Sequence, residues 1–424
     1  MAWIDNLFKM MTEKKASDLH MTSEHVPMVR ESGDMVQLQG VPKLSKDQMW
    51  QILMEICPER NRKQFEEGWD SDFAYALEGC GRFRSNYFMD RNGPGAVFRR
   101  IPDKILTAEQ LGLPPAVLKL CEFKKGLVLV TGPTGSGKST TLAAMMDHIN
   151  STRKEHIITI EDPVEFVHPA KQCLVNQREV HQHTKSFAAA LRAALREDPD
   201  IVLVGEMRDL ETTRIAIETA ETGHLVFGTL HTSTASSTVD RIINQFPAEE
   251  QEQIRLMLAG SLRGVVAQNL LKKKGGGRVA AQEIMFVTPG VASNIREGKT
   301  YQIPSAMQTG ARYGMVLLND ALEKLVKADL VEPMEAYDRS IDKEEMAKKL
   351  KALGFDVESH QAAAAAAAAN KPAPAPQPAQ PIAKPVDGGA KDGAWVVKPK
   401  EPVQPQAPQA PNNPPGVNWR RPNG

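Results

Sequence analysis

The stretch "LVLVTGPTGSGKSTTLAAMMDHI", residues 127–149, decides the fold of this chain. An apolar run comes first, the pattern G-x-x-x-x-G-K-S follows from Gly132 to Ser139, and a segment with apolar residues on one helical face comes last. This order of strand, loop and helix is typical of a P-loop, whose backbone N–H groups surround a phosphate at the positive end of a helix. The sequence therefore predicts a nucleotide-binding domain.

The residue types of this motif fit the binding of ATP with Mg²⁺. Glycines let the backbone come close to the phosphates, Lys138 reaches the β and γ oxygens, and the Ser139 hydroxyl can ligate Mg²⁺. The alternative is a glycine-rich turn without a ligand, which the strand before it and the helix after it disfavour. We expect phosphate contacts from the whole loop, which consists of Gly132, Pro133, Thr134, Gly135, Ser136, Gly137, Lys138, Ser139 and Thr140.

Apolar runs that alternate with helical segments predict the rest of this domain. Nearly unbroken apolar strands between helices are typical of a parallel sheet that is covered on both faces. After about residue 247 the pattern becomes mainly helical, up to the amphipathic "KEEMAKKLKALG". We therefore expect an α/β domain over residues 121–355 with a helical C-terminal part, and its strands at residues 127–130, 157–160, 201–204 and 225–228.

Composition divides the remainder of the chain. Residues 1–104 mix short alternating runs with helical stretches, which predicts a small α+β domain, and the proline-containing residues 105–120 predict a linker. The first helix carries an apolar stripe that we expect to pack on its own domain or on a neighbouring subunit, in preference to a membrane. Of the 29 prolines, 14 follow Lys371, after an eight-alanine run, so residues 356–424 predict a disordered tail with polyproline II character.

Bulk composition excludes several classes of function. The 52 basic and 52 acidic residues balance, so no overall field favours direct binding to nucleic acid or to an anionic membrane. The four cysteines are scattered without a C-x-x-C pair, which disfavours both a disulfide framework and a structural zinc site. No stretch of about 18 uncharged apolar residues is present, so we expect a cytoplasmic protein without a membrane span.

Carboxylates follow two of the predicted strands. Glu161, Asp162 and Glu165 come after one strand, and Glu206 and Asp209 come after the next. Ligands gather at the carboxyl ends of parallel strands, and phosphoryl transfer needs acids to hold Mg²⁺ and to orient the attacking water. We expect Glu161 and Glu206 to be catalytic and to ligate the metal, whereas Asp209 is expected to cap the following helix. For Glu165 both interpretations stay open.

Two histidines flank the last predicted strand of the sheet. His231 stands at the carboxyl end of this strand, where it can form a hydrogen bond to the γ-phosphate and act as a catalytic sensor. The alternative for any histidine beside an apolar run is a core residue whose hydrogen bonds are satisfied. For His224 a nucleotide contact and a core position remain equally open.

A positive charge from outside the loop would also assist phosphoryl transfer. In "GRFRSNYF", Arg82 and Arg84 are two residues apart and therefore lie on the same face of a strand. We expect them to reach the nucleotide across a domain or subunit boundary. An exposed basic strand face is the alternative.

Several long motifs resemble one known family. The runs "GPTGSGKSTT", "ITIEDPVEFVH", "LREDPDIVLVGEMRDLETTRIAIETAETGHLVFGTLHT" and "STVDRIINQFP" are similar to the secretion ATPases of type II secretion and type IV pili. Together with the N-terminal "ASDLHMTSEHVPMVR" and "GRFRSNYF", they most resemble the retraction ATPases of type IV pili. The resemblance covers roughly residues 1–345 and leaves the tail uncovered.

The resemblance implies a fold, cofactors and partners. It implies a PAS-like N-terminal domain, a RecA-like P-loop ATPase domain, ATP and Mg²⁺ as cofactors, and a homohexamer that drives pilus retraction and twitching motility. It also implies a place at the pilus base beside the inner membrane, with the membrane platform protein and a second retraction ATPase as partners. In this family Glu161, Asp162 and Glu165 match the Asp box, Glu206 matches the Walker B glutamate, and residues 223–241 match the His box.

One departure bears on the direction of movement. Retraction ATPases carry an "AIRNLIRE"-like motif that is linked to retraction, and here "GVASNIREGKT" keeps only its second half, Asn294 to Glu297. The rival functions are an accessory retraction ATPase, a pilus assembly or secretion ATPase, a nucleic-acid motor, and a scaffold that binds nucleotide without turnover. Assembly ATPases usually carry paired C-x-x-C motifs and extra N-terminal domains, which this sequence lacks.

Overall fold

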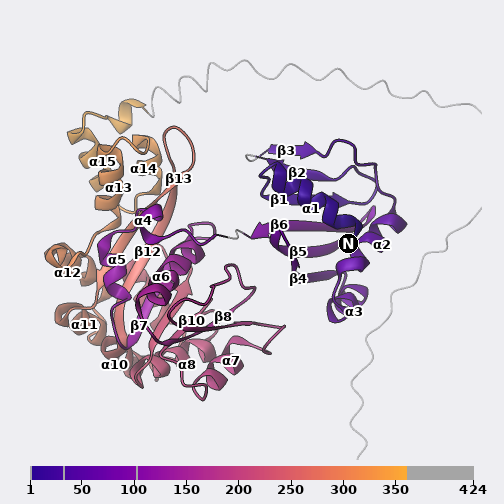
Figure 1. Cartoon of the computed structure of the whole chain (residues 1–424). Helices are drawn as coiled ribbons and strands as arrows, with labels where there is room; N and C mark the ends of the chain where they lie inside the picture. The colour runs from indigo at the N-terminus through magenta and orange to yellow at the C-terminus, as the bar shows by residue number, and fades with distance from the viewer. Residues whose placement is uncertain (1, 32–33, 102–103, 361–424) are drawn as a thin grey trace, which may run out of the picture. The chain divides into compact units, whose positions relative to one another are not determined.

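The computed structural model describes residues 2–31, 34–101 and 104–360, which form two sheets with separate hydrophobic cores (Figure 1). Of the tail predicted for residues 356–424, residues 361–424 lie outside the described residues. Within the described part of the chain, no helix is long and apolar enough to span a membrane.

The N-terminal sheet is antiparallel and has six strands in the order β3-β2-β1-β6-β5-β4. Helix α1 (Trp3–Glu13) buries Ile4, Leu7 and Phe8 in the core of this domain, which confirms that its apolar stripe packs internally. Two further helices are α2 (Lys46–Ile56) and α3 (Glu59–Gly68). The strands are β1 (Asp18–Thr22), β2 (Met28–Glu31), β3 (Asp34–Gln37), β4 (Asp70–Leu77), β5 (Gly81–Asp90) and β6 (Gly93–Ile101).

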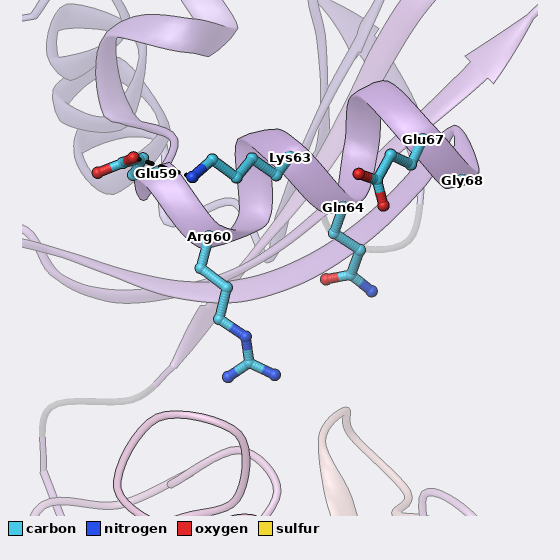
Figure 2. A pocket seen from close by; sticks show the side chains of 6 residues that line it. All are labelled: Glu59, Arg60, Lys63, Gln64, Glu67 and Gly68. Atoms are coloured by element: carbon cyan, nitrogen blue, oxygen red, sulfur yellow. Dashed lines mark ion pairs between the residues drawn. The ribbon is translucent and has the colours of Figure 1, made fainter.

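Helix α3 presents a charged outer face, which Figure 2 shows from close by. The side chains of Glu59, Arg60, Lys63, Gln64 and Glu67 all project from this one helix and are exposed. Lys63 and Glu59 form an ion pair at 3.2 Å, one helical turn apart. Such exposed pairs contribute little to stability, and this face has the character of a solvated helix surface.

The second sheet has seven strands in the order β13-β12-β7-β11-β10-β8-β9. All neighbouring strands are parallel except β12 and β13, which confirms the predicted parallel sheet. The four apolar runs form strands as expected, and β9, which is half-polar, is an additional edge strand. The strands are β7 (Gly126–Thr131), β8 (His156–Glu161), β9 (Leu174–Glu179), β10 (Ile201–Val204), β11 (Leu225–Leu230), β12 (Leu262–Lys272) and β13 (Arg278–Phe286).

Helices cover both faces of this sheet. In β7, Leu127 and Leu129 face one core cluster, and Val128 and Val130 face the other, because successive strand residues point to opposite faces. The first face packs against α7 (Phe187–Ala194), α8 (Leu210–Glu221), α9 (Ala235–Ile243), α10 (Gln251–Ser261), α11 (Pro289–Arg296) and α12 (Ile303–Thr309). The second face packs against α5 (Pro115–Leu120) and α6 (Lys138–Thr152).

The expectation of a mainly helical chain after residue 247 is wrong for residues 262–286. These residues form the long hairpin β12–β13, whose strand β12 pairs with β7. The run "LRGVVAQNLLK" is apolar on both faces because the strand is buried in the sheet, so it has no alternation that would separate it from a buried helix. The turn at Gly275, Gly276 and Gly277, which all have positive φ, was the available signal for a hairpin.

A third cluster joins the C-terminal helices to this hairpin. Leu271 of β12 and Ala281 of β13 pack with α13 (Leu318–Lys327), α14 (Pro333–Arg339) and α15 (Lys343–Ala352), which lie together beside β13 in Figure 1. The cluster extends to Val357, which is buried. Residues 105–120 contain α4 (Ala108–Leu111) and α5, and Val117 and Leu120 of this segment are buried in the core.

A buried carboxylate links two helix N-termini to the hairpin. Glu283 of β13 accepts hydrogen bonds from the backbone N–H of Ala235, at 2.7 Å, and of Leu318, at 3.1 Å. These are the first residues of α9 and α13. Burial raises the pKa of Glu283, although the two N–H donors oppose this shift. The carboxylate thereby satisfies donors that the helices themselves leave unpaired.

We expect Glu283→Leu to destabilise this domain. Both N–H groups would stay buried without an acceptor, at a cost of about 1–3 kcal/mol each. The melting temperature of the purified chain, followed by circular dichroism, measures the loss. Glu283→Gln keeps one acceptor oxygen and should lose less stability. Equal melting temperatures for Glu283→Leu and the unaltered chain would contradict this role.

Candidate nucleotide site

The phosphate loop runs from the end of β7 to the start of α6, as the sequence predicts. Gly132 and Gly137 have φ of 145° and 87°, a conformation that favours glycine. A Cβ at Gly132 would lie 2.2 Å from the backbone oxygen of Gln268, and a Cβ at Gly137 would lie 3.0 Å from the Gln268 side-chain nitrogen. The close approach of the β12 backbone therefore requires glycine at position 132, whereas at position 137 the positive φ is the main reason for glycine.

The Lys138 side chain folds over this loop. Its ammonium group donates hydrogen bonds to the backbone oxygens of Gly132, at 2.9 Å, and Pro133, at 3.3 Å. Burial lowers the pKa of Lys138, and the negative charges of Glu206 and Glu165 oppose this shift. The two acids therefore lie within electrostatic range of the ammonium group. Lys138 also begins α6, so the positive end of that helix meets the same loop.

The acids that follow β8 and β10 line one cavity with the loop. The two strands are parallel neighbours, and a Cβ at Gly205 would lie 3.2 Å from Cα of Glu161. The predicted residues that line this cavity include Thr134, Gly135, Gly137, Lys138, Ser139, Thr140, Glu161, Asp162, Glu165, Glu206 and His231. The structure therefore brings together most of the residues that the sequence assigns to nucleotide and metal.

Glu206 and His231 are joined directly. The His231 ring nitrogen Nε2 lies 2.8 Å from Oε1 of Glu206, and Arg208 forms an ion pair with the same oxygen at 2.5 Å. Burial alone would raise the pKa of Glu206, but Arg208 and His231 outweigh it and hold this pKa below its ordinary value. This environment therefore favours the ionised form of Glu206.

Glu161 has the opposite electrostatic environment. Its carboxylate accepts hydrogen bonds from Thr159 Oγ1 at 2.6 Å and from Gln177 Nε2 at 3.2 Å. Burial nevertheless dominates and raises the pKa of Glu161. The two carboxylates that face the cavity are thus different in kind, since one remains ionised and the other takes up a proton more readily.

The structure separates the remaining acid and histidine from this group. Asp209 accepts a hydrogen bond from the Thr212 N–H at 2.8 Å, so it caps α8 as expected. His224 precedes β11, and its oxygen pairs with the N–H of Gly126 at the start of β7. The phosphate loop begins six residues farther along that strand, about 20 Å away. Within one subunit, His224 is therefore not brought to the loop.

Arg82 and Arg84 lie on one face of β5, on either side of the buried Phe83, as predicted. Arg84 is exposed. The guanidinium of Arg82 lies 3.3 Å from the carboxylate of Glu179, the last residue of β9, and forms an ion pair with it. The assignment of these arginines to nucleotide stays a prediction.

Sequence reasoning missed three residues of this region. Arg208 contacts Glu206, the Thr229 hydroxyl donates to the oxygen of Gly205, and Gln268 contacts the loop from β12. Arg208 stands two residues after Glu206 in "GEMRD", which was a usable signal. Gln268 had a weaker signal, as a polar residue inside the apolar run of β12.

The donor set fits Mg²⁺ held together with a nucleotide. Mg²⁺ is usually bound by one or two carboxylates plus substrate phosphates, and retains several waters. In the described residues, no group of three or more His, Cys, Asp or Glu is arranged to hold a metal alone. Ser139 and Glu206, which line the same cavity, are the residues that would complete such a site around a bound phosphate.

The chain is similar to proteins of one family over most of its length. The model of the family "Type II/IV secretion system protein" matches residues 2–299. The chain is 52% identical to the type IV pilus retraction ATPase PilT of Pseudomonas aeruginosa. The alignment spans 337 residues, which are 80% of this chain and 98% of that protein. The type IV pilus ATPase PilU of the same bacterium is 39% identical over 322 residues, 76% of this chain and 84% of that protein.

A solved structure agrees with these relatives. The crystal structure of the pilus retraction motor PilT with bound ADP has a TM-score of 0.77 and 47% sequence identity, over 81% of this chain and 98% of that chain. The second domain of this chain therefore has the RecA-like ATPase fold.

We expect His231→Ala to lower the rate of ATP turnover roughly 10- to 100-fold, because a ligating carboxylate would lose the partner that orients it. The affinity for a fluorescent ATP analogue should change much less, since the hydrogen bond of His231 goes to Glu206. Steady-state kinetics and fluorescence titration of the purified chain measure both. His148→Ala, on α6 beyond the loop, is the matched control. Unchanged turnover in His231→Ala would refute the role.

Proposed function

The chain belongs to the type II/IV secretion system protein family, and from this premise we propose that it is the ATP-hydrolysing motor of type IV pilus retraction. The observation that carries the proposal is the identity of 52% with a retraction ATPase over nearly the full length of that protein. The accessory-type relative from the same bacterium is less similar, which favours the retraction motor over the accessory ATPase.

The phosphate loop is the part of the chain that binds ATP. Its N–H groups and the N-terminus of α6 offer donors to the phosphates, and the Lys138 ammonium adds a full positive charge. Carbonyl oxygens of the loop hold this ammonium at the site, so little rearrangement is needed for it to reach a phosphate. Mg²⁺, when bound with ATP, would neutralise the charge that develops on the transferred phosphoryl group.

Two carboxylates take different tasks in this proposal. Glu206, whose pKa is held below its ordinary value, stays anionic and is suited to hold Mg²⁺ together with Ser139. Glu161, whose pKa burial raises, is suited to accept a proton from the attacking water, because a general base works best when its pKa lies nearer the operating pH. Pairs of acids with separated pKa values commonly divide catalytic roles in this way.

His231 connects the carboxylate to the end of β11. Its hydrogen bond to Glu206 orients the carboxylate, and the loop that follows leads directly into α9. A change at the γ-phosphate would therefore reach α9 through His231, which supports its role as a sensor. Arg82 and Arg84 are proposed to add positive charge toward the nucleotide.

The assembly and its surroundings also belong to the proposal. A homohexamer would let cleavage of ATP drive rigid-body movement between neighbouring subunits. We propose that the ring works in the cytoplasm at the pilus base, peripheral to the inner membrane, against the membrane platform protein and beside a second retraction ATPase. Balanced charge supports the absence of direct nucleic-acid binding.

Lys138→Ala tests the enzyme. We expect it to abolish Mg²⁺-dependent ATP turnover, because the only full positive charge that the loop itself supplies is lost, while the fold persists. Phosphate release by the purified chain, with and without Mg²⁺, measures turnover, and circular dichroism reports the fold. Persistent turnover by a folded Lys138→Ala would count decisively against this site.

Glu206→Ala tests the direction of the motor in cells. If the chain drives retraction, cells with Glu206→Ala should keep surface pili and lose twitching, as deletion of the gene should also do. An assembly motor would instead leave cells without pili. Electron microscopy counts the pili, and the spread of colonies on agar reports motility. Bald cells in both strains would sink the retraction assignment.

A further inference from the structure

A cluster of buried polar side chains lies directly behind the phosphate loop. It joins the loop and the start of α6 to the hairpin β12–β13, which is far away in the sequence, and each of the members Ser136, Thr141, Gln268 and Gln282 is at most 5% exposed. Buried polar groups are costly unless they are hydrogen-bonded, so the arrangement of donors and acceptors here decides what the cluster does.

Gln268 of β12 is the centre of this cluster. Its side-chain Nε2 donates to the backbone oxygen of Ser136 at 2.6 Å. Its Oε1 accepts from the Thr141 hydroxyl at 2.8 Å and from Gln282 Nε2 at 2.9 Å. Gln282 is the partner of Gln268 across the strand pair. Because the Ser136 backbone oxygen can only accept a hydrogen bond, the nitrogen side of the Gln268 amide must face the loop and the oxygen side must face Thr141 and Gln282.

This contact fixes one peptide plane of the loop. A trans peptide is rigid and planar, so a Ser136 oxygen that is held against Gln268 turns the Gly137 N–H in the opposite direction. Gly137 lines the nucleotide cavity, and Ser136 is buried behind it. The N–H is therefore presented toward the side where a phosphate would accept it. Gln268 also meets the start of the loop, since its own backbone oxygen leaves no room for a Cβ at Gly132.

We propose that Gln268 is a positioning residue for the phosphate loop: its amide holds the Ser136–Gly137 peptide in the orientation that binds nucleotide. Gln282 donates a hydrogen bond to the oxygen of the Gln268 amide and thereby supports the same orientation of that amide. The proposal rests on the proposed function only in that this loop binds a nucleotide. It predicts that nucleotide affinity, and not stability alone, depends on the side chain at position 268.

The test compares the affinity of the full-length chain for a fluorescent ADP analogue with its melting temperature. Gln268→Met keeps the shape of the side chain and removes all three hydrogen bonds, so we expect it to weaken ADP binding about tenfold or more. Asn319→Leu is the matched control, because Asn319 is also a buried amide that holds backbone groups, at Ile341 and Asp342. It should lower the melting temperature and leave ADP affinity unchanged.

Gln268→Glu isolates the hydrogen bond to the loop. A carboxylate can still accept from Thr141 and Gln282, but it cannot donate to the Ser136 oxygen, whereas a protonated carboxyl can. The ADP affinity of Gln268→Glu should therefore fall as pH rises, and that of the unaltered chain should change less over the same range. A purely structural role would give no such pH profile. This variant keeps the test decisive if Gln268→Met does not fold.

The outcomes separate this inference from the proposed function. No ADP binding by the unaltered chain would overturn the proposed function. Binding by the unaltered chain and equal affinity in folded Gln268→Met and Gln268→Glu would overturn the role of Gln268 alone. Weakened binding in both, with the Asn319→Leu control at normal affinity, supports it.

Discussion

The close approach of strand β12 to the phosphate loop is the constraint on which the site depends. The backbone oxygen of Gln268 lies where a Cβ of Gly132 would be, at 2.2 Å, so loop and strand can meet only through glycine. This contact requires β12 to lie beside β7 in the sheet, which it does. The loop conformation is therefore a property of the whole sheet, although its motif is short.

The electrostatics of the cavity depend on the same sheet. Glu161 ends β8 and Glu206 lies two residues after β10, the parallel neighbour of β8, yet their pKa values move in opposite directions. Burial prevails at Glu161, whereas Arg208 and His231 prevail at Glu206. The order of the strands brings the two acids together, and the residues around each carboxylate shift its pKa in a different direction. A single edge of a sheet can thus place side by side two carboxylates whose pKa values are shifted in opposite directions.

Sequence reasoning predicted the features that local patterns of residues encode, and it missed those that depend on contacts between residues far apart in the sequence. Apolar strands, the loop, the cap at Asp209 and the placement of Glu206 and His231 at the carboxyl ends of the strands follow from periodicity and from the geometry of parallel sheets, whereas the hydrogen bond between these two residues was not predicted. The hairpin over residues 262–286 did not, because a strand buried on both faces has no alternation. Gln268 could not be found without β12, since its contact with Ser136 joins residues 132 positions apart.

Strand β13 shows how the loop and the C-terminal helices are held by one element. Gln282 and Glu283 are consecutive, so their side chains point to opposite faces of the sheet. Gln282 reaches the cluster behind the phosphate loop, and Glu283 reaches the first N–H groups of α9 and α13. Helix α9 follows the loop that begins with His231. One strand therefore contacts the support of the phosphate loop on one face and the N-termini of α9 and α13 on the other.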